Sequence, residues 1–243
     1  GDESAYFLGA NRNKRGITLN LKHPSGQKVL KELLQKTDVV IDNFKLGTLS
    51  KLGFDDEWFK TNAPQVVRCS ILGYGSTGPR AGLPGYDFLL QAESGLMNIT
   101  GESDGDPMKL GVAIVDLCTG LYALSTILGA INARHSSGLG QSIEVSLYDT
   151  GVSLLANVAS NFLISGKTAG RYGNGHPNIV PYNAYPTKDG MIALSIGNDM
   201  QFANFANAVG KTNWSEDDRF KRNRDRVENR GACDGMISDL FKT

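Results

Sequence analysis

The sequence has few of the residues that mark secreted, metal-binding or disordered proteins. Its three cysteines, Cys69, Cys118 and Cys233, lie far apart and form neither a metal-ligand spacing nor an even-numbered disulfide framework. The three histidines are equally scattered, which argues against a metal site. Only 8 prolines accompany 29 glycines, a mix that favours an α/β fold with many tight turns over a disordered chain.

Excess charge and long apolar runs are also missing. The 25 basic residues balance the 25 acidic ones, which gives no sign of a nucleic-acid partner. We find no apolar run near the roughly 20 residues that a membrane-spanning helix needs. The chain opens at Gly1 and stops at Phe241-Lys242-Thr243, so we expect an internal fragment without its targeting segment. The cysteine pattern favours a reducing compartment, such as the mitochondrial matrix or the cytoplasm.

Strand and helix patterns alternate through the first two thirds of the chain. The predicted strands cover residues 17–21, 39–41, 66–71 and 143–146. The predicted helices cover residues 24–34, 46–52, 55–61, 87–97, 112–134 and 148–164. This alternation is typical of βαβ units and predicts an α/β fold with a parallel sheet. In the long helix, we expect one face to point to the core, through Leu117, Leu121, Leu124 and Leu128.

The composition changes after Gly166 and predicts a domain boundary. The following residues are loop-like and rich in Gly, Pro and Asn. Beyond them we predict a hairpin turning at Asp189-Gly190, an amphipathic helix and a charged, solvated helix, over 184–194, 201–209 and 217–230. The predicted organisation is therefore a large domain, a linker and an incomplete small α+β domain, over residues 1–165, 166–180 and 181–243.

Asp116 is the carboxylate with the most informative surroundings. It has apolar neighbours on both sides near the start of the long helix. It could be a first-turn charge that complements the helix dipole. It could equally be a partly desolvated carboxylate that acts as a nucleophile. Asp87, which follows Pro84-Gly85-Tyr86, reads most simply as a helix cap.

Other polar residues lie where ligands commonly bind. Asn43 and Phe44 follow a buried strand at its carboxyl end, which is either a simple turn or the ligand-binding edge of an open sheet. Lys22 and Lys51 are either surface charges or phosphate ligands. The glycine-rich loop at 73–79 has the spacing of a dinucleotide loop, but Pro79 follows at once, so we assign no dinucleotide site.

Five ordered stretches resemble the family III CoA-transferases, or CaiB/BaiF family, which include formyl-CoA transferase, carnitine CoA-transferase and α-methylacyl-CoA racemase. They are residues 11–21, 42–47, 73–79, the motif residues within 85–97, and Asp116 with Gly120 continuing to 138–141. Residues 94–101 and 179–182 look closest to the succinyl-CoA:glutarate (hydroxymethylglutarate) CoA-transferase branch.

This resemblance implies a Rossmann-like large domain with helices on both faces of its sheet, a smaller second domain and an interlocked homodimer. It implies that Asp116 is the catalytic aspartate. The implied CoA-binding residues are Asn43, Phe44, Thr48 and Lys51, with Leu19 and Lys22 near the adenosine end. The implied substrate-binding residues are Tyr86, Asp87, Gly197 and Gln201. No cofactor is bound permanently, because coenzyme A enters as a thioester substrate. Where formyl-CoA transferase has a mobile run of glycines, this chain has Gly197 to Gln201.

The expected activity is the transfer of coenzyme A between carboxylic acids in acyl-CoA metabolism, from succinyl-CoA to a dicarboxylic acid such as glutarate, through an aspartyl-CoA intermediate. Arg171 is the cation that we would assign to the second carboxylate. The alternative activity is α-methylacyl-CoA racemisation, which needs two acid/base groups. The racemases have a histidine directly before the aspartate that matches Asp87. This chain has Tyr86 at that position, and tyrosine is a poor base. An alternative without catalysis is a truncated, inactive dimer partner.

Overall fold

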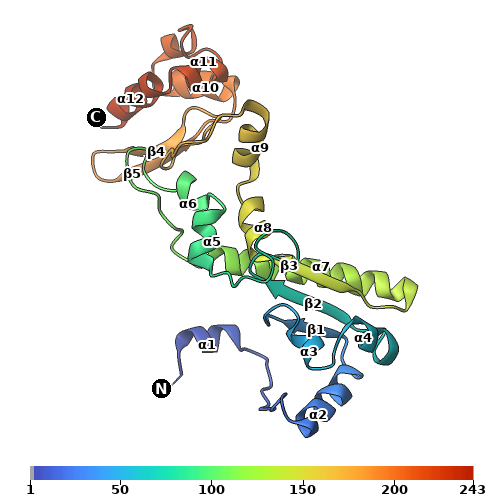
Figure 1. Ribbon diagram of the computed structural model, residues 1–243. Helices are drawn as coiled ribbons and strands as arrows, with labels where there is room; N and C mark the ends of the chain where they lie inside the picture. The colour runs from blue at the N-terminus through green and yellow to red at the C-terminus, as the bar shows by residue number, and fades with distance from the viewer. Residues whose placement is uncertain (1–2, 243) are drawn as a thin grey trace. The chain divides into compact units, whose positions relative to one another are not determined.

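The computed structural model of the protein describes residues 3–242, in two compact units (Figure 1). The first unit comprises Gly1–Pro84 and Cys118–Leu147, and the second comprises Gly85–Leu117 and Tyr148–Thr243. Helix α7 (Ile114–Ser137) begins in the second unit and continues in the first. These units are not the domains expected from the sequence, whose boundary at 166–180 stays a prediction.

The first unit is built on a three-stranded parallel sheet in the order β1-β2-β3. Its strands are β1 (Val39–Asp42), β2 (Val67–Leu72) and β3 (Ser142–Ser146). The register pairs Asp42 with Ser70 and Ser70 with Glu144, so three polar residues lie side by side across the sheet. The sheet confirms the predicted α/β class.

Helices cover both faces of this sheet. On one face, Ala123 and Ile127 of α7 pack with Cys69 and the other residues of a buried cluster (Figure 1). The second cluster joins α2 (Pro24–Leu34), α3 (Thr48–Lys51) and α4 (Asp56–Asn62). Val39 packs with the first cluster and Val40 with the second, as the alternation of a strand requires. Full burial of a side chain such as Ile127 stabilises the fold by about 1.5–3 kcal/mol.

The predicted strand at 17–21 is wrong. No strand pairs with these residues in the part of the chain that the structure describes, and Ile17 is 71% exposed. Among residues 3–242, the one helix or strand that precedes α2 is helix α1 (Ala5–Ala10), which buries none of its residues. Alternating apolar and polar residues do not make a strand without a neighbour to accept its backbone hydrogen bonds.

The predicted core face of α7 is also wrong. The four leucines Leu117, Leu121, Leu124 and Leu128, which we call the leucine stripe, are 53–62% exposed. The residues that α7 buries lie on the opposite side of the helix from these leucines. They are Val115, Thr119, Ala123, Ile127 and Ala130. The helix is apolar all round, so its pattern does not distinguish the packed face from the open one. Small side chains let α7 lie close to the sheet.

Helix α7 also bears on the expectation that no segment could span a membrane. Among residues 3–242 it is the one helix that is long and apolar enough to do so by length and composition. The expectation was therefore too strict. The core helix of a globular domain passes the same test, and the contacts of Ala123, Ile127 and Ala130 with the sheet are of that kind.

Two helices that the sequence predicted as continuous are each divided into two shorter helices in the structure. Residues 87–97 form α5 (Asp87–Glu93) and α6 (Leu96–Ile99), because Gly95 between them has φ 92°, a left-handed conformation suited to glycine. Residues 148–164 form α8 (Leu147–Ser153) and α9 (Ala156–Ser165).

The rest of the second unit is a hairpin with helices. Strands β4 (Tyr182–Pro186) and β5 (Met191–Ser195) pair antiparallel, which confirms the predicted hairpin. The helical segments that follow are α10 (Asp199–Ala208), the 3-10 helix η1 (Thr212–Ser215), α11 (Asn223–Glu228) and α12 (Arg230–Phe241). They share one buried cluster, formed by Val180, Tyr185, Ile196, Phe202, Phe220, Cys233 and Ile237. The prediction of a solvated helix over 217–230 is wrong, because α11 is short and Arg226 is completely buried.

Candidate functional site

Asp116 lies in the first turn of α7, and the side chain of Asp87 from α5 holds that turn. The Oδ1 atom of Asp87 accepts hydrogen bonds from Val115 N at 2.8 Å and from Asp116 N at 3.3 Å. The first N–H groups of a helix have no partner within the helix, so a carboxylate at this point stabilises it. Asp87 therefore caps α7 from outside as well as beginning α5.

Gln91 completes this arrangement from inside the fold. It is fully buried and donates its Nε2 to Asp87 Oδ2 at 2.6 Å. Its Oε1 accepts the backbone N–H of Leu110 at 2.9 Å. The segment that leads into Asp116 is thus held at both ends. Gln91 was not among the predicted site residues, although its spacing of four from Asp87 on one helix is a signal that could have suggested the pair.

The Asp116 carboxylate reaches solvent but is partly desolvated. Burial raises its pKa above the ordinary value, and the negative charge of Asp87 raises it further. Within residues 3–242 the carboxylate forms no ion pair. It is therefore available for chemistry, and its raised pKa makes the ionised oxygens more reactive toward an electrophile.

Tyr86 adjoins this pair without joining its hydrogen bonds. It occupies the N-cap position of α5 but its side chain caps no N–H there, and it is 69% exposed. Its phenol is available to a ligand. The structure thus brings Asp87 and Asp116 together, with Tyr86 next in the chain.

In the first unit, two of the predicted CoA residues, Asn43 and Phe44, lie on the turn between β1 and α3, and Thr48 begins α3. Asn43 Nδ2 donates to the carbonyl of Ile71 at 2.6 Å and ties the end of β1 to β2. Thr48 Oγ1 donates to the carbonyl of Lys45 at 2.6 Å at the start of α3. Phe44 is 43% exposed. Asn43 and Thr48 therefore shape this turn, whatever else they bind.

A cleft of about 250 Å³ lies beside that turn. Phe44 and Thr48 line it, together with charged residues of both signs such as Lys45 and Glu144. The other predicted CoA residues, Asn43, Lys51, Leu19 and Lys22, are not among its lining residues. Lys22 and Lys51 are exposed and Leu19 is half-buried.

The glycine-rich loop at 73–79 follows β2 and is fixed by Glu144 of β3. Ser76 N donates to Glu144 Oε1 at 2.8 Å. Gly75 has φ 85°, and a Cβ atom there would lie 3.0 Å from the same oxygen. Glycine at this position lets the loop fold back against the carboxylate.

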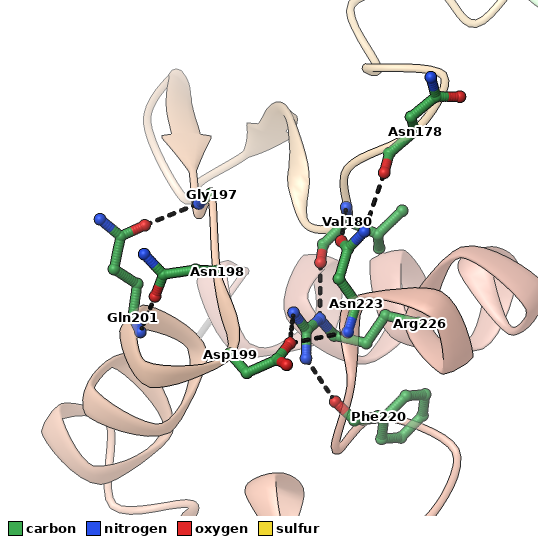
Figure 2. A network of polar contacts seen from close by, with 9 residues as sticks. All are labelled: Asn178, Val180, Gly197, Asn198, Asp199, Gln201, Phe220, Asn223 and Arg226. Carbon is green, nitrogen blue, oxygen red and sulfur yellow. Dashed lines mark hydrogen bonds and ion pairs between the residues drawn. The ribbon is translucent and has the colours of Figure 1, made fainter. Parts of the chain in front are cut away.

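Gly197 and Gln201 contact each other at the start of α10. Gly197 N donates to Gln201 Oε1 at 2.7 Å, and Gln201 N donates to Oδ1 of the N-cap residue Asn198 at 2.9 Å (Figure 2). Both backbone N–H groups therefore have partners within their own turn. Because the Gln201 oxygen is engaged, its Nε2 is the end of the amide that can donate to another molecule.

Arg171, the proposed partner of a second carboxylate, is occupied with backbone. Its guanidinium donates to the carbonyls of Asn98, Glu102 and Gly105. These bonds fix the loop after α6. No cluster of three or more His, Cys, Asp or Glu side chains that could hold a metal ion occurs in the described part of the chain.

Comparison with known proteins places the chain in one family. The model described as CoA-transferase family III matches residues 1–243. The chain is 44% identical to a succinate–glutarate CoA-transferase of Agrobacterium fabrum, over 97% of this chain and 59% of that protein. It is 41% identical to the human succinyl-CoA:glutarate CoA-transferase, over 100% of this chain and 55% of that protein. It thus spans between half and two thirds of the length of these relatives.

A solved structure supports the same assignment. The crystal structure of a CAIB/BAIF family protein from Brucella suis superposes with a TM-score of 0.79 at 43% identity, and covers 99% of this chain and 64% of that one.

Proposed function

This chain belongs to CoA-transferase family III, and from that premise we propose that the protein moves coenzyme A between carboxylic acids, with Asp116 as the acyl acceptor. The observation that carries the proposal is the Asp116 carboxylate itself. It has no ion-pair partner within residues 3–242, it is partly desolvated, and Asp87 and Gln91 hold the backbone on which it stands.

The proposed reaction divides one difficult exchange into successive displacements. An Asp116 oxygen attacks the donor thioester, the carbon–sulfur bond breaks, and a mixed anhydride and CoA thiolate result. The thiolate attacks the Asp116 carbonyl carbon, which gives an aspartyl-CoA thioester and releases the donor acid. The acceptor carboxylate then attacks this thioester and expels the thiolate. The thiolate finally attacks the acceptor acyl carbon, forms the new CoA thioester and restores the Asp116 carboxylate.

Each tetrahedral intermediate needs a hydrogen-bond donor for its oxyanion. We assign this role to Gln201 Nε2, because Gly197 N–H holds the other end of that amide. The backbone N–H groups of Gly197 and Gln201 already donate to Gln201 Oε1 and Asn198 Oδ1. We assign the exposed Tyr86 phenol a contact with the reacting acyl group, because Tyr86 directly precedes Asp87 in the chain.

The proposed substrates are succinyl-CoA as donor and a dicarboxylic acid such as glutarate as acceptor. The names of the two relatives support them. Coenzyme A is proposed to bind near Phe44 and Thr48, at the cleft beside the β1–α3 turn. Lys22 and Lys51, with Leu19 and Asn43, remain proposed contacts of the adenosine and phosphate groups.

Racemisation is the less favoured activity. It needs an acid/base group on each side of the substrate carbon. Asp87 already accepts hydrogen bonds from Val115, Asp116 and Gln91, and its neighbour Tyr86 replaces the histidine of the racemases. Isotope exchange at the α-carbon of a 2-methylacyl-CoA in deuterated buffer, without any acceptor acid, would favour the racemase instead.

We also propose a homodimer. The leucine stripe of α7 is apolar and more than half exposed, and self-complementary apolar surfaces suit the symmetric contact of two identical chains. Sedimentation equilibrium should give twice the monomer mass, and Leu124→Glu should lower it. A monomer at all concentrations would contradict the proposal. It would indicate that the leucine stripe is not the contact between two copies of the chain.

The buried thiols of Cys69 and Cys233, which form no disulfide, support a reducing compartment such as the mitochondrial matrix or the cytoplasm.

The activity is tested by trapping the acyl group on Asp116. The protein is incubated with succinyl-CoA and hydroxylamine, digested, and the peptide that contains Asp116 is weighed by mass spectrometry. A hydroxamate at Asp116 is expected, and an unmodified peptide during measurable turnover would contradict the mechanism. Calorimetry with coenzyme A separates the inactive-partner alternative, which predicts no binding.

A further inference from the structure

Arg226 of α11 is a completely buried cation whose contacts reach three segments of the second unit. Its Nε donates to the carbonyl of Val180 at 2.7 Å, and its Nη1 donates to the carbonyl of Phe220 at 2.7 Å. Its Nη2 forms an ion pair with Asp199 Oδ1 at 2.8 Å (Figure 2). One guanidinium thus joins the entry to β4, the segment before α11 and the first residue of α10.

Asn223 closes this arrangement on the other side. Its backbone N donates to Asp199 Oδ1 at 2.7 Å, and its Oδ1 accepts from Val180 N at 3.1 Å. Its Nδ2 donates to the carbonyl of Asn178 at 2.9 Å. We call Asp199, Asn223 and Arg226 the Arg226 brace. Figure 2 shows its members converging on the start of α10, beside the turn of Gly197 and Gln201.

The brace reaches Gln201 from two directions. Asp199 precedes Gln201 by two residues in the first turn of α10, and both partners of its Oδ1 atom come from α11. Phe202, the residue after Gln201, is buried, with the Arg226 guanidinium 4.5 Å from the centre of its ring. Side chains on both sides of Gln201 in the chain, those of Asp199 and Phe202, are therefore in contact with Arg226.

An arginine is an energetically unfavourable residue at a completely buried position. Burying its charge costs more desolvation free energy than an apolar side chain would, and its carboxylate partner is half exposed. A lysine ammonium has no planar fork with which to serve acceptors in three directions. What the guanidinium supplies, and an apolar side chain does not, is a fixed geometry between three backbone segments.

We propose that the Arg226 brace positions Gln201, so that Asp199 and Arg226 are positioning residues for coenzyme A transfer although neither touches the substrate. This inference rests on the proposed function, in which Gln201 Nε2 donates to the acyl oxygen. Without the brace, the first turn of α10 shifts and the amide no longer meets the oxyanion. Binding of coenzyme A, assigned to the first unit, does not depend on it.

The test compares Asp199→Ala with Asp199→Asn. The asparagine keeps an oxygen that can accept from Arg226 and Asn223, whereas the alanine removes it. Because small displacements of a catalytic group cost large factors in rate, we expect Asp199→Ala to lower kcat about 10- to 100-fold and Asp199→Asn less than about threefold. Neither variant should change the affinity for coenzyme A measured by calorimetry.

Tyr185→Phe is the matched control. It removes a partly buried hydrogen bond, from Tyr185 of the same buried cluster to Asp234, outside the brace. It should lower the unfolding temperature and leave kcat unchanged. An equal fall in kcat in Tyr185→Phe and Asp199→Ala would show a general effect of stability and overturn the inference, as would an unchanged kcat in Asp199→Ala.

Amide hydrogen exchange tests the brace without relying on activity. The Gly197 and Gln201 amides should exchange at least about tenfold faster in Asp199→Ala than in the unaltered protein, and not in Tyr185→Phe. Unchanged exchange in Asp199→Ala would show that the brace does not hold the turn of Gly197 and Gln201, and would contradict the inference. If the unaltered protein transfers no coenzyme A while this exchange pattern appears, the proposed function fails and the brace stands as a structural device alone.

Discussion

The carboxylate of Asp87 accepts a hydrogen bond from the backbone N–H of Asp116 at 3.3 Å, so the side chain of one aspartate fixes the backbone of the other. Its hydrogen bonds fix the first turn of α7, and its negative charge raises the pKa of the Asp116 carboxylate, after the larger effect of burial. Position and reactivity of the proposed nucleophile thus depend on the same neighbour.

Replacing Asp116 should remove transfer and leave the fold intact. We expect Asp116→Ala and the isosteric Asp116→Asn each to lower the transfer rate by at least about 1,000-fold, because both remove the carboxylate that is proposed to accept the acyl group. Coenzyme A binding by calorimetry should be unchanged. Residual transfer within tenfold of the unaltered protein would refute the assignment.

The raised pKa of Asp116 has a consequence for stability. Because the folded state holds this proton more tightly than the unfolded state, the contribution of Asp116 to stability is favourable at low pH and is lost as the pH rises through the folded-state pKa. Asp116→Asn should therefore unfold at a higher temperature than the unaltered protein at neutral pH, and the gap should close in acid. Thermal unfolding at several pH values measures this, and a gap that widens in acid would contradict it.

Asp87→Asn should move the acid limb of the transfer rate to lower pH. The substitution removes the charge that raises the Asp116 pKa, so Asp116 ionises at a lower pH. The limb is read from kcat/KM as a function of pH, and a shift to higher pH would contradict the electrostatic role. The maximal rate should also fall, since the asparagine amide would oppose the Gln91 amide. Asp38→Asn, which alters a carboxylate paired with Arg134 in the first unit, away from the proposed CoA cleft, is the control and should leave the limb in place.

Gln91→Leu should destabilise the protein by about 1–3 kcal/mol, because it leaves the partly buried Leu110 N–H and Asp87 Oδ2 without the hydrogen bonds that the fully buried Gln91 amide supplies. Gln65→Leu is the matched control. Its amide donates to the carbonyl of Gln35 at 3.3 Å near the surface, and its loss should cost less than about 1 kcal/mol. Urea unfolding measures both, and equal values would show that the Gln91 contacts carry no special weight.

Gly75→Ala should destabilise the loop after β2 by about 1–2 kcal/mol, because alanine disfavours a positive φ and its Cβ would crowd Glu144 Oε1. Gly129→Ala in α7 is the opposite case, since nothing lies within 4 Å of the added Cβ. It should stabilise the helix by roughly 0.5–1 kcal/mol. Unfolding temperatures that move in the same direction would contradict this reasoning.

The strands β1, β2 and β3 and the β4–β5 hairpin were predictable because each has a local pattern of apolar residues and turns. The packed face of α7 was not, because leucines occupy one side and alanines with Ile127 the other, and only the sheet decides between them. The strand expected at 17–21 does not form, because an alternating pattern in one segment cannot provide the partner strand that its backbone hydrogen bonds need. The buried state of Arg226 depends on acceptors as far away in the chain as Val180.

For the candidate site, the sequence pointed to Asp116 and Asp87 separately but gave no sign of their contact. The spacing of Asp87 and Gln91 was visible, whereas the bond from Gln91 to Leu110 joins residues that only the fold brings together. The assigned roles of Asn43, Phe44, Thr48, Lys51, Leu19 and Lys22 stay predictions.

The two faces of α7 bear on how the purified protein should behave. Much of the apolar surface of this helix adds nothing to the stability of the chain on its own, since the leucine stripe is open to water. Such a surface associates more strongly in sulfate or phosphate salts, which enhance apolar contacts, and more weakly in the cold. Concentration, salt and temperature would then govern the solubility of the chain more than pH does.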